Sequence, residues 1–263
     1  MKEFSVLKEA ALEGGKVLAA KFGKVGYRLK GRANLLTEAD LASQKAVIAV
    51  IRRAFPEDGF MAEESPVENS PNGRLWIIDP LDGTTNYAHS FPAAAVSVAF
   101  AEHGSVRFGA VYDPFRREFF TAQEGKGAFL NGRRLKVSGV PSLSKALLVT
   151  GFAYDRAEKA EFYCGFFVEF MKLSHDVRRM GAASLDFCWL AAGRTDGYWE
   201  FGLKPWDVAA GGLVVREAGG MVTNFSGKPW PVGESMGAQT LATNGRLHPA
   251  MLRVIRRRLR RQA

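Results

Sequence analysis

Apolar and polar positions follow two different periods along the chain, and these periods separate predicted helices from predicted strands. Near the start, apolar residues recur at the helical period and predict an amphipathic helix over residues 3 to 22. A second helix is predicted to begin after Thr37, because Asp40 follows it at the spacing of a capping box, and to end at Phe55. Two helices with one apolar face each therefore open the chain.

The next stretch changes to short apolar runs bounded by clusters of Gly, Pro and Asn, a pattern typical of β-strands. The predicted strands are residues 75–79, 95–100, 107–113 and 118–122. Because they follow one another closely, they favour a sheet built mainly of sequential antiparallel strands.

The second half of the chain mixes helices with short strands. Helices are predicted at 157–173, 182–192 and 206–218, and strands at 196–200, 220–225 and 240–243, ahead of a last helix. This order predicts an alternating α-β-α-β-α sandwich, a layered fold of the α+β or α/β class. Since no linker or repeat divides the chain, we expect one domain over 1–263, with approximate halves 1–145 and 146–263.

Composition places the 263 residues among soluble globular proteins, since 47% are hydrophobic and 24% charged. No apolar run approaches the roughly 18 residues that span a bilayer, and the first residues lack a signal-peptide core, so we expect a cytoplasmic protein without membrane partners. Cys164 and Cys188 have no metal-type partner nearby, which argues against disulfide scaffolds and zinc ribbons.

The formal net charge of +9 belongs largely to the end of the chain. Six arginines gather there: Arg253, Arg256, Arg257, Arg258, Arg260 and Arg261. Without them the balance falls to +3. A solvated helix end is the simpler interpretation of this cluster, and contact with nucleic acid or another anionic surface is the alternative.

The segment WIIDPLDGTTN, residues 76 to 86, carries the most chemical information. An apolar strand delivers Asp79, and a turn then brings Asp82 within three residues, so that both carboxylates can face one cation. Mg²⁺ commonly takes one or two carboxylates beside water and substrate phosphate. If a helix begins after the turn, the amides of Gly83, Thr84 and Thr85 offer an anion site next to the metal. An ordinary Asp-Gly turn is the alternative interpretation.

Further acidic residues precede and follow this segment. Glu63 and Glu64 come after a candidate strand, and Asp207 stands at a predicted helix start. Each has a structural alternative: the two glutamates as a solvated loop, Asp207 as a simple N-cap, and Asp40 as the reciprocal partner of Thr37.

Taken together, these motifs resemble the signatures of the inositol monophosphatase family. The strings AEES, WIIDPLDGTTN and WDVAAGGLVVREAGG occur in the family's usual order and spacing, and the likeness covers nearly the whole chain. The resemblance implies a Mg²⁺-dependent phosphomonoesterase of the sugar-phosphatase fold, which acts on inositol 1-phosphate through a metal-activated water. It also implies a homodimer and inhibition by Li⁺.

Carried over by position, the resemblance implies two to three Mg²⁺ ions, with Mn²⁺ as a possible substitute. One ion would bind Glu63, Asp79 and the carbonyl group of Leu81. The second would bind Asp79, Asp82 and Asp207, and a third, weaker ion is often invoked near Glu63. The implied catalytic residues that orient the attacking water are Glu63, Thr84 and Asp40.

The resemblance also implies how the substrate is held. The implied contacts are Asp82, Gly83, Thr84, Thr85, Ala183, Glu200 and Asp207. Arg178 and Arg179 are candidates for a second phosphate, because arginine suits bidentate binding of anions. Two loop positions bear on the site: Asn34 stands where the family usually has Asp, which removes a charge near the metals, and Lys30 lies in the loop that usually covers them.

The metal motif does not separate the family's substrates, so fructose 1,6-bisphosphate, alone or beside inositol monophosphate, is the alternative. A second alternative is a regulator associated with RNA and transcription, which uses the basic C-terminal tail. Aspartyl-phosphate chemistry is disfavoured because D-x-x-D-G-T departs from its D-x-D-x-T pattern. The C-x₅-R spacing from Cys188 to Arg194 lies in an apolar helical stretch, so we expect a core cysteine rather than a nucleophile.

Overall fold

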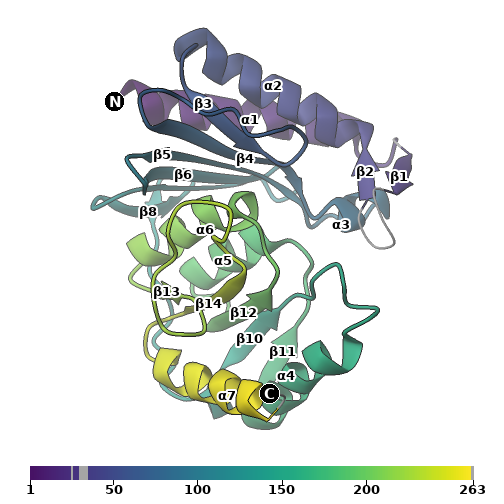
Figure 1. Cartoon of the computed structure of the whole chain (residues 1–263), viewed down its shortest axis with the longest axis vertical. Coiled ribbons are helices and arrows are strands. Elements are labelled where there is room, and N and C mark those ends of the chain that lie inside the picture. Colours follow the sequence, from purple (N-terminus) through teal and green to yellow (C-terminus); the bar gives the residue numbers. More distant parts are fainter. Residues whose placement is uncertain (25, 30–34, 262–263) are drawn as a thin grey trace.

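The computed structural model describes residues 1–24, 26–29 and 35–261, and it stacks helices and sheets in five alternating layers (Figure 1). The outer layers are α1 (Lys2–Lys21) with α2 (Glu38–Ala54), and α4 (Ala160–Leu173) with α7 (His248–Arg260). The central layer is α5 (Ala183–Ala191) with α6 (Pro205–Glu217), and two short elements are α3 (Thr84–Ala88) and the 3₁₀ turn η1 (Leu143–Lys145). The predicted α-β-α-β-α sandwich is confirmed.

The larger sheet has seven strands in the order of the chain, β3 to β9. They are β3 (Gly59–Ala62), β4 (Arg74–Asp82), β5 (Ala95–Glu102), β6 (Ser105–Asp113), β7 (Glu118–Gln123), β8 (Gly127–Leu130) and β9 (Arg133–Arg134). Each neighbouring pair is antiparallel except β3 with β4, which is parallel. The prediction of mainly sequential antiparallel strands is therefore confirmed for this sheet.

The smaller sheet is mixed and has the strand order β11-β10-β12-β14-β13. Its strands are β10 (Leu147–Thr150), β11 (Asp176–Arg178), β12 (Gly197–Phe201), β13 (Met221–Thr223) and β14 (Gln239–Thr243). β10 is parallel to both β11 and β12, and β14 is antiparallel to β12 and β13. A separate antiparallel pair joins β1 (Tyr27–Leu29) to β2 (Leu35–Thr37).

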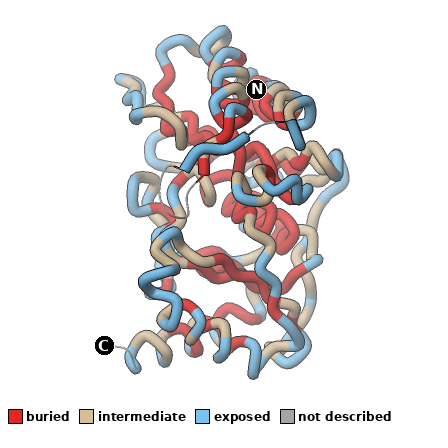
Figure 2. Tube along the Cα trace, turned by 90° about the vertical axis from the view of Figure 1, so that its right-hand side faces the viewer, coloured by how far each residue is buried: buried red, intermediate tan, exposed pale blue. Residues whose placement is uncertain are grey.

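The two helices of the central layer are buried between the sheets, and they fix the position of the residues around them (Figure 2). Small residues make the close packing possible. A Cβ atom at Gly109 of β6 would lie 2.9 Å from the carbonyl oxygen of Ala210, so α6 rests directly on the sheet backbone. α6 also contacts β4 and β5, and in its first turn the carbonyl oxygen of Trp206 accepts a hydrogen bond of 3.2 Å from Ser97 Oγ of β5.

Several boundaries differ from the sequence-based expectation, each for a local reason. The helix expected from residue 157 begins at Ala160, because residues before it form turns closed by the amides of Glu158 and Lys159 on the carbonyl oxygen of Asp155. The strand expected at 75–79 continues to Asp82 with a shift of register in its pairing to β5. No helix of the described ranges is both long and apolar enough to cross a membrane.

Candidate active site

The end of β4 and the turn that follows it form the centre of the candidate site. Asp79 is buried, and its Oδ1 accepts a hydrogen bond of 3.0 Å from the amide of Leu81. Asp79 and Asp82 both pair with β5, and the register shifts between them, so that Pro80 and Leu81 form a bulge opposite a single residue of β5. Gly83 has φ +87°, and a Cβ there would lie 2.7 Å from the carbonyl oxygen of Ala93, so the turn requires glycine.

The hydroxyl group of Thr84 lies between the β4 turn and α2. Its Oγ1 is 3.2 Å from Asp40 Oδ1 and 3.0 Å from the carbonyl oxygen of Leu81. Asp40 is fully buried, and its Oδ2 accepts from both the amide and the hydroxyl group of Thr37 at 2.7 and 2.6 Å. The predicted capping box is therefore confirmed, and the same carboxylate also reaches Thr84.

Asp82 is anchored to the first turn of α5. Its Oδ1 accepts from the amide of Ala183 at 3.2 Å, and its Oδ2 accepts from the amide and hydroxyl group of Ser184 at 2.7 and 2.5 Å. A carboxylate at a helix N-terminus is stabilised by the free amides and the helix dipole. This contact brings together Asp82 and Ala183, which are 101 residues apart in the chain.

Asp207 and Glu63 complete the acidic group. Asp207 lies in the first turn of α6, where its Oδ2 accepts from the amide of Lys204 at 2.7 Å. The amide of Glu63 donates to the carbonyl oxygen of Ile78 at 3.2 Å, which holds it beside β4. The interpretation of Asp207 as a simple N-cap is wrong: Lys204 is the N-cap of α6, and Asp207 is the N3 residue of a capping box.

The electrostatics show that these four carboxylates are close neighbours. Burial raises the pKa of Asp79 well above its usual range, and the negative charges of Glu63, Asp82 and Asp207 raise it further. Burial also raises the pKa of Asp207, with Glu63 and Asp82 adding to the effect. Like charges gathered in a low-dielectric site favour either protonation or a bound cation.

The donor set fits a hard cation that keeps part of its own hydration shell. Within the ranges that the structure describes, no three Asp, Glu, His or Cys side chains lie close enough together to hold a metal ion by themselves. Mg²⁺ rarely uses such an all-protein cage; it takes one or two carboxylates together with water and substrate phosphate. Carboxylate oxygens beside an open cavity match that requirement, and the described residues that line the cavity include no Cys, Met or His, the donors that softer metals prefer.

A cavity of about 300 Å³ opens beside these acids. The expected site residues on its wall are Asp82, Gly83, Thr84, Thr85, Arg179, Ala183, Glu200 and Asp207. Asp40 contacts Thr84 of this wall, whereas Glu63, Asp79 and Leu81 are not among the lining residues. Arg178 is directed elsewhere and forms an ion pair with Asp176. Lys30 and Asn34 lie outside the described residues.

Glu200 lies on the far side of this cavity, on β12. Burial raises its pKa to about 7, against the opposing effect of a hydrogen bond from the hydroxyl group of Tyr198. Its carboxylate rests against the backbone of Gly151, where a Cβ would approach Glu200 Oε2 to 2.1 Å. Any side chain at position 151 would therefore collide with the carboxylate of Glu200 in its present position.

Sequence reasoning missed several residues on the cavity wall, among them Gly181, Ala182, Phe201, Gly202 and Leu203. The segment after β10 contributes Gly151, Phe152, Ala153, Tyr154 and Arg156, and α5 contributes Asp186. β10 itself was not expected, since four residues without alternation give little signal. For Asp186 a signal existed: it is three residues after Ala183, so one helix face presents both.

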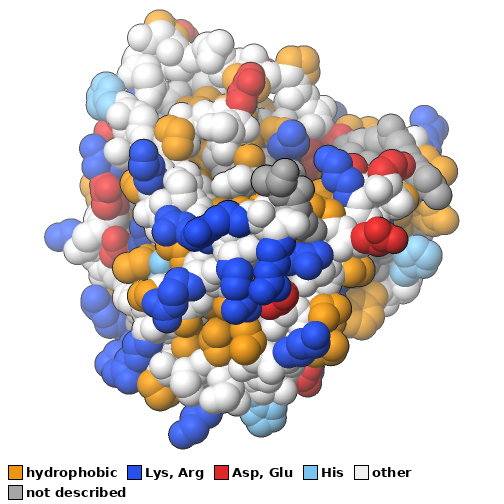
Figure 3. Space-filling model, turned by 60° about the horizontal axis from the view of Figure 1, so that its bottom comes forward, with side chains coloured by type: hydrophobic (Ala, Val, Ile, Leu, Met, Phe, Trp, Pro, Cys, Tyr) orange, Lys and Arg blue, Asp and Glu red, His pale blue; other side chains and the backbone are white. Residues whose placement is uncertain are grey.

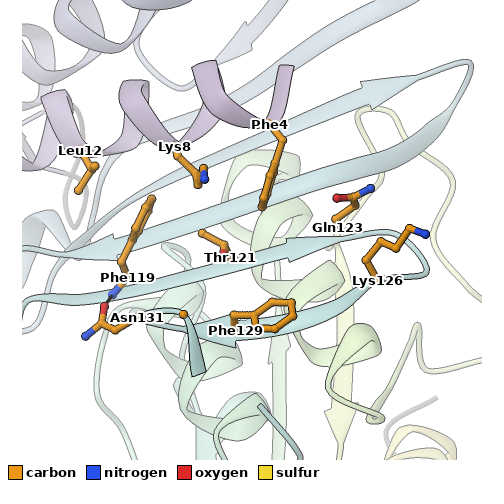
Figure 4. Close-up of a pocket in the computed structure, with 10 residues that line it drawn as sticks. Phe4, Lys8, Leu12, Phe119, Thr121, Gln123, Lys126, Phe129 and Asn131 are labelled. Atoms are coloured by element: carbon orange, nitrogen blue, oxygen red, sulfur yellow. Dashed lines mark hydrogen bonds between the residues drawn. The ribbon is translucent and has the colours of Figure 1, made fainter. Parts of the chain in front are cut away.

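A larger cavity of about 460 Å³ lies between α1 and the strands β7 and β8 (Figure 4). Phe4, Phe119 and Phe129 form its walls, and Lys8 and Lys126 lie at its edge. It has no carboxylate among its lining residues. The acid-rich cavity beside Asp82 is therefore the better candidate for metal-dependent chemistry.

Cys188 is a core residue, as expected. It is fully buried in α5, and burial raises the pKa of its thiol well above the usual value. Arg194, at the end of the C-x₅-R spacing, forms an ion pair with Glu118. A buried, protonated thiol does not act as a nucleophile.

The C-terminal arginines lie on α7, whose apolar face, with Met251, Val254 and Ile255, packs into the core. Arg257 and Arg261 pair with Glu169, and Arg256 donates to a backbone carbonyl group. Figure 3 shows Lys and Arg side chains gathered over the end of the molecule that carries this helix. The contacts of Arg256, Arg257 and Arg261 thus hold the helix against its neighbours. The Lys and Arg side chains on this end of the molecule form a basic surface.

Comparison with known proteins agrees with this geometry. A family model described as the inositol monophosphatase family matches residues 2–260. An inositol-1-monophosphatase of Synechocystis sp. is 44% identical over 243 residues, which are 91% of this chain and 84% of the relative. A Pseudomonas aeruginosa protein named Nus factor SuhB is 47% identical over 203 residues, 75% of each chain. The solved structure of an inositol monophosphatase from Anabaena (Nostoc) has a TM-score of 0.87 at 42% identity, covering 97% of this chain and 96% of that one.

Proposed function

Because the chain belongs to the inositol monophosphatase family, we propose that it is a Mg²⁺-dependent phosphomonoesterase that hydrolyses inositol 1-phosphate to inositol and phosphate. The observation that carries the proposal is that Asp82 and Asp207 line one cavity and that their negative charges, together with burial, raise the pKa of nearby Asp79, an arrangement that a divalent cation would relieve. Release of phosphate from inositol 1-phosphate that stops with chelator and returns with Mg²⁺ tests it.

The residues that would hold the metal are those of the acidic group. Glu63, Asp79 and the carbonyl group of Leu81 would hold one ion, and Asp79, Asp82 and Asp207 a second. Bound Mg²⁺ supplies charge stabilisation at the phosphoryl group and lowers the pKa of a bound water. A third ion near Glu63, and replacement of Mg²⁺ by Mn²⁺, remain predictions.

Thr84 and Asp40 position the attacking water. The Thr84 hydroxyl group has one proton and two acceptors within reach, Asp40 Oδ1 and the carbonyl oxygen of Leu81. Once that proton is donated, the oxygen has lone pairs left that can accept a hydrogen bond from water. Glu63 would hold the other side of the same water. Orientation of this kind lowers the barrier by placing the nucleophile in line with the phosphorus.

The two sides of the cavity would bind the two ends of the substrate. The turn at Gly83, Thr84 and Thr85 would hold the phosphate through its amides, beside Asp82 and Asp207. Ala183 and Glu200, on α5 and β12, would contact the hydroxyl groups of the inositol ring. Buried carboxyl groups that meet substrate hydroxyls provide specificity rather than rate.

A second candidate substrate, fructose 1,6-bisphosphate, is favoured by one specific observation. Arg179 and Arg156 both line the cavity, so a second anionic group would meet positive charge there. Arg178, the other candidate for a second phosphate, is paired with Asp176.

A further alternative, association with RNA and transcription, is suggested by relatives named Nus factor SuhB and by the basic face of α7. Exchange of Arg253 and Arg260 for Gln tests it without removing the apolar residues of α7 from the core. RNA binding that weakens steeply with salt in the wild type, and less steeply in this variant, would support the alternative. No RNA binding at low salt would exclude it.

The homodimer, its inhibition by Li⁺, the single domain over 1–263 and the cytoplasmic location also remain predictions. Light scattering of the purified chain tests the first of the four. A single cooperative thermal transition would support one domain, whereas separate unfolding of the two halves, 1–145 and 146–263, would contradict it.

A further inference from the structure

Asp186 is a buried carboxyl group on the wall of the candidate active site, and its Oδ1 has no hydrogen-bond partner among the described residues. Its side chain is 1% exposed, and it lines the cavity that Asp82, Glu200 and Asp207 also line. Its Oδ1 is fully buried and makes no hydrogen bond with the described residues. A buried polar atom left in this state costs free energy, so it calls for an explanation.

The other buried aspartates of the described ranges are all hydrogen-bonded, and Asp186 alone is not. Asp196 accepts from Ser138 Oγ and the amide of Leu147 at 2.5 and 2.7 Å. Asp58 accepts from Arg74 Nε and Trp76 Nε1, both at 2.8 Å. Buried carboxyl groups with a structural role thus have hydrogen-bond donors within the protein, and Asp186 does not follow this pattern.

The position of Asp186 on α5 places it on the wall of the cavity. Ala183, three residues earlier and on the same helix face, donates its amide to Asp82. Glu200 and Tyr198 share one face of β12. Two carboxyl groups, one from a helix and one from a strand, therefore meet in the same cavity.

The charges around Asp186 agree with this position. Burial, followed by the negative charges of Glu200 and Asp82, raises its pKa well above the usual range, and the positive charge of Arg179 opposes the rise. These couplings place Glu200 and Arg179 within electrostatic reach of Asp186, although it forms no ion pair with Arg179. Its hydrogen-bonding capacity is therefore not consumed by the protein.

We propose that Asp186 is a specificity-determining residue that hydrogen-bonds a hydroxyl group of the substrate's alcohol portion, beside the hydroxyl group that Glu200 contacts. This inference rests on the proposed phosphatase activity and narrows its substrate class. The preferred substrates are phosphomonoesters of polyols with two or more free hydroxyl groups, rather than simple alkyl or aryl phosphates. A site whose polar groups need a hydroxyl partner rejects an analogue that lacks one.

The test compares inositol 1-phosphate with 4-nitrophenyl phosphate, which has no alcohol hydroxyl groups, in the presence of Mg²⁺. The variants are Asp186→Leu, which removes the hydrogen-bonding group, and Asp186→Asn, which keeps it. The matched control is Asp196→Asn, because Asp196 is also buried, at 6% exposed, and both of its carboxylate oxygens accept hydrogen bonds. The readouts are the ratio of kcat/KM for the two substrates, direct titration with inositol alone, and Tm.

We expect Asp186→Leu to lower the ratio of kcat/KM by about 10- to 100-fold through KM, and Asp186→Asn to restore most of it. Because an unsatisfied buried group is removed, Tm should rise in Asp186→Leu by roughly 2–4 °C, whereas it should fall in Asp196→Asn. A ratio within twofold of wild type, with unchanged inositol binding, would overturn the proposal. A wild type that hydrolyses neither substrate would instead refute the phosphatase activity, and inositol titration would still decide the role of Asp186.

Discussion

Asp40 Oδ1 and Thr84 Oγ1 lie 3.2 Å apart, and this contact links the start of α2 to the turn that follows β4. The same aspartate closes the capping box with Thr37. One side chain thus has a structural role toward α2 and a positioning role toward Thr84. The two roles can be separated by changing Thr84, because that leaves the cap in place.

Thr84→Val keeps the shape of the side chain and removes its hydroxyl group. We expect kcat to fall roughly 10²- to 10³-fold, the order that loss of proton positioning costs. Thr84→Ser should retain most of the activity, since Oγ remains within reach of Asp40. Steady-state kinetics on inositol 1-phosphate measures this, and a Thr84→Val enzyme with wild-type kcat would exclude the hydroxyl group from water positioning.

Arg179→Ala separates the two candidate substrates. If Arg179 meets a second phosphate, turnover of fructose 1,6-bisphosphate should fall about 10- to 100-fold, the effect of a lost charge-assisted hydrogen bond, while inositol 1-phosphate changes less. Arg178→Ala is the matched control, because Arg178 is paired with Asp176. Equal losses on both substrates in Arg179→Ala would contradict a second phosphate site.

Glu200 should make the metal-free protein less stable as pH rises. Its pKa is about 7 in the folded state, against an ordinary value of 4.5, so the folded protein holds a proton that the unfolded chain has lost between these values. The protonated Glu200 therefore contributes at most about 3 kcal/mol to the free energy of unfolding. This contribution is fully present below pH 4.5 and is lost by pH 7. Urea unfolding of wild type and Glu200→Gln in chelator should show the variant gaining relative stability over this range. A constant difference would show that Glu200 titrates normally.

His248 should make the protein less stable as pH falls, the opposite of the effect of Glu200. It is buried between the hydroxyl groups of Thr223 and Thr243, at 2.9 and 3.1 Å, and burial lowers its pKa to about 4. Between pH 6.5 and 4 the unfolded chain binds a proton that the folded protein does not, so stability falls as pH falls through this range. Relative to His248→Gln, the wild type should lose stability there. No change in the difference between pH 7 and 4 would contradict the buried neutral imidazole.

The sequence predicts those parts of the fold that depend on local pattern. The capping box at Thr37, the long helices and the strands β4 to β7 of the larger sheet follow from periodicity and spacing. The short strands β10 and β11 do not, because elements of this length are set by their neighbours in the sheet rather than by their own residues.

In the candidate site, too, some residues can be predicted from local sequence and others only from the structure. Asp79 and Asp82 stand in one motif, and the resemblance to the family adds Glu63 and Asp207. Asp186 was not expected, since one aspartate in an apolar helix is unremarkable until the structure shows that nothing in the protein satisfies it. Which of two adjacent arginines faces the cavity likewise depends on the path of the chain after β11, which spacing does not determine.

The central claim is that the buried carboxylates act through a divalent cation, and one measurement tests it most directly. Phosphate release from inositol 1-phosphate is followed for wild type and Asp82→Asn, with Mg²⁺, with excess chelator, and after Mg²⁺ is restored. We predict wild-type activity that disappears with chelator and returns with Mg²⁺, and a loss in Asp82→Asn that added Mg²⁺ does not recover. Phosphate release by folded wild type that persists in chelator, or that survives in Asp82→Asn, would contradict the account.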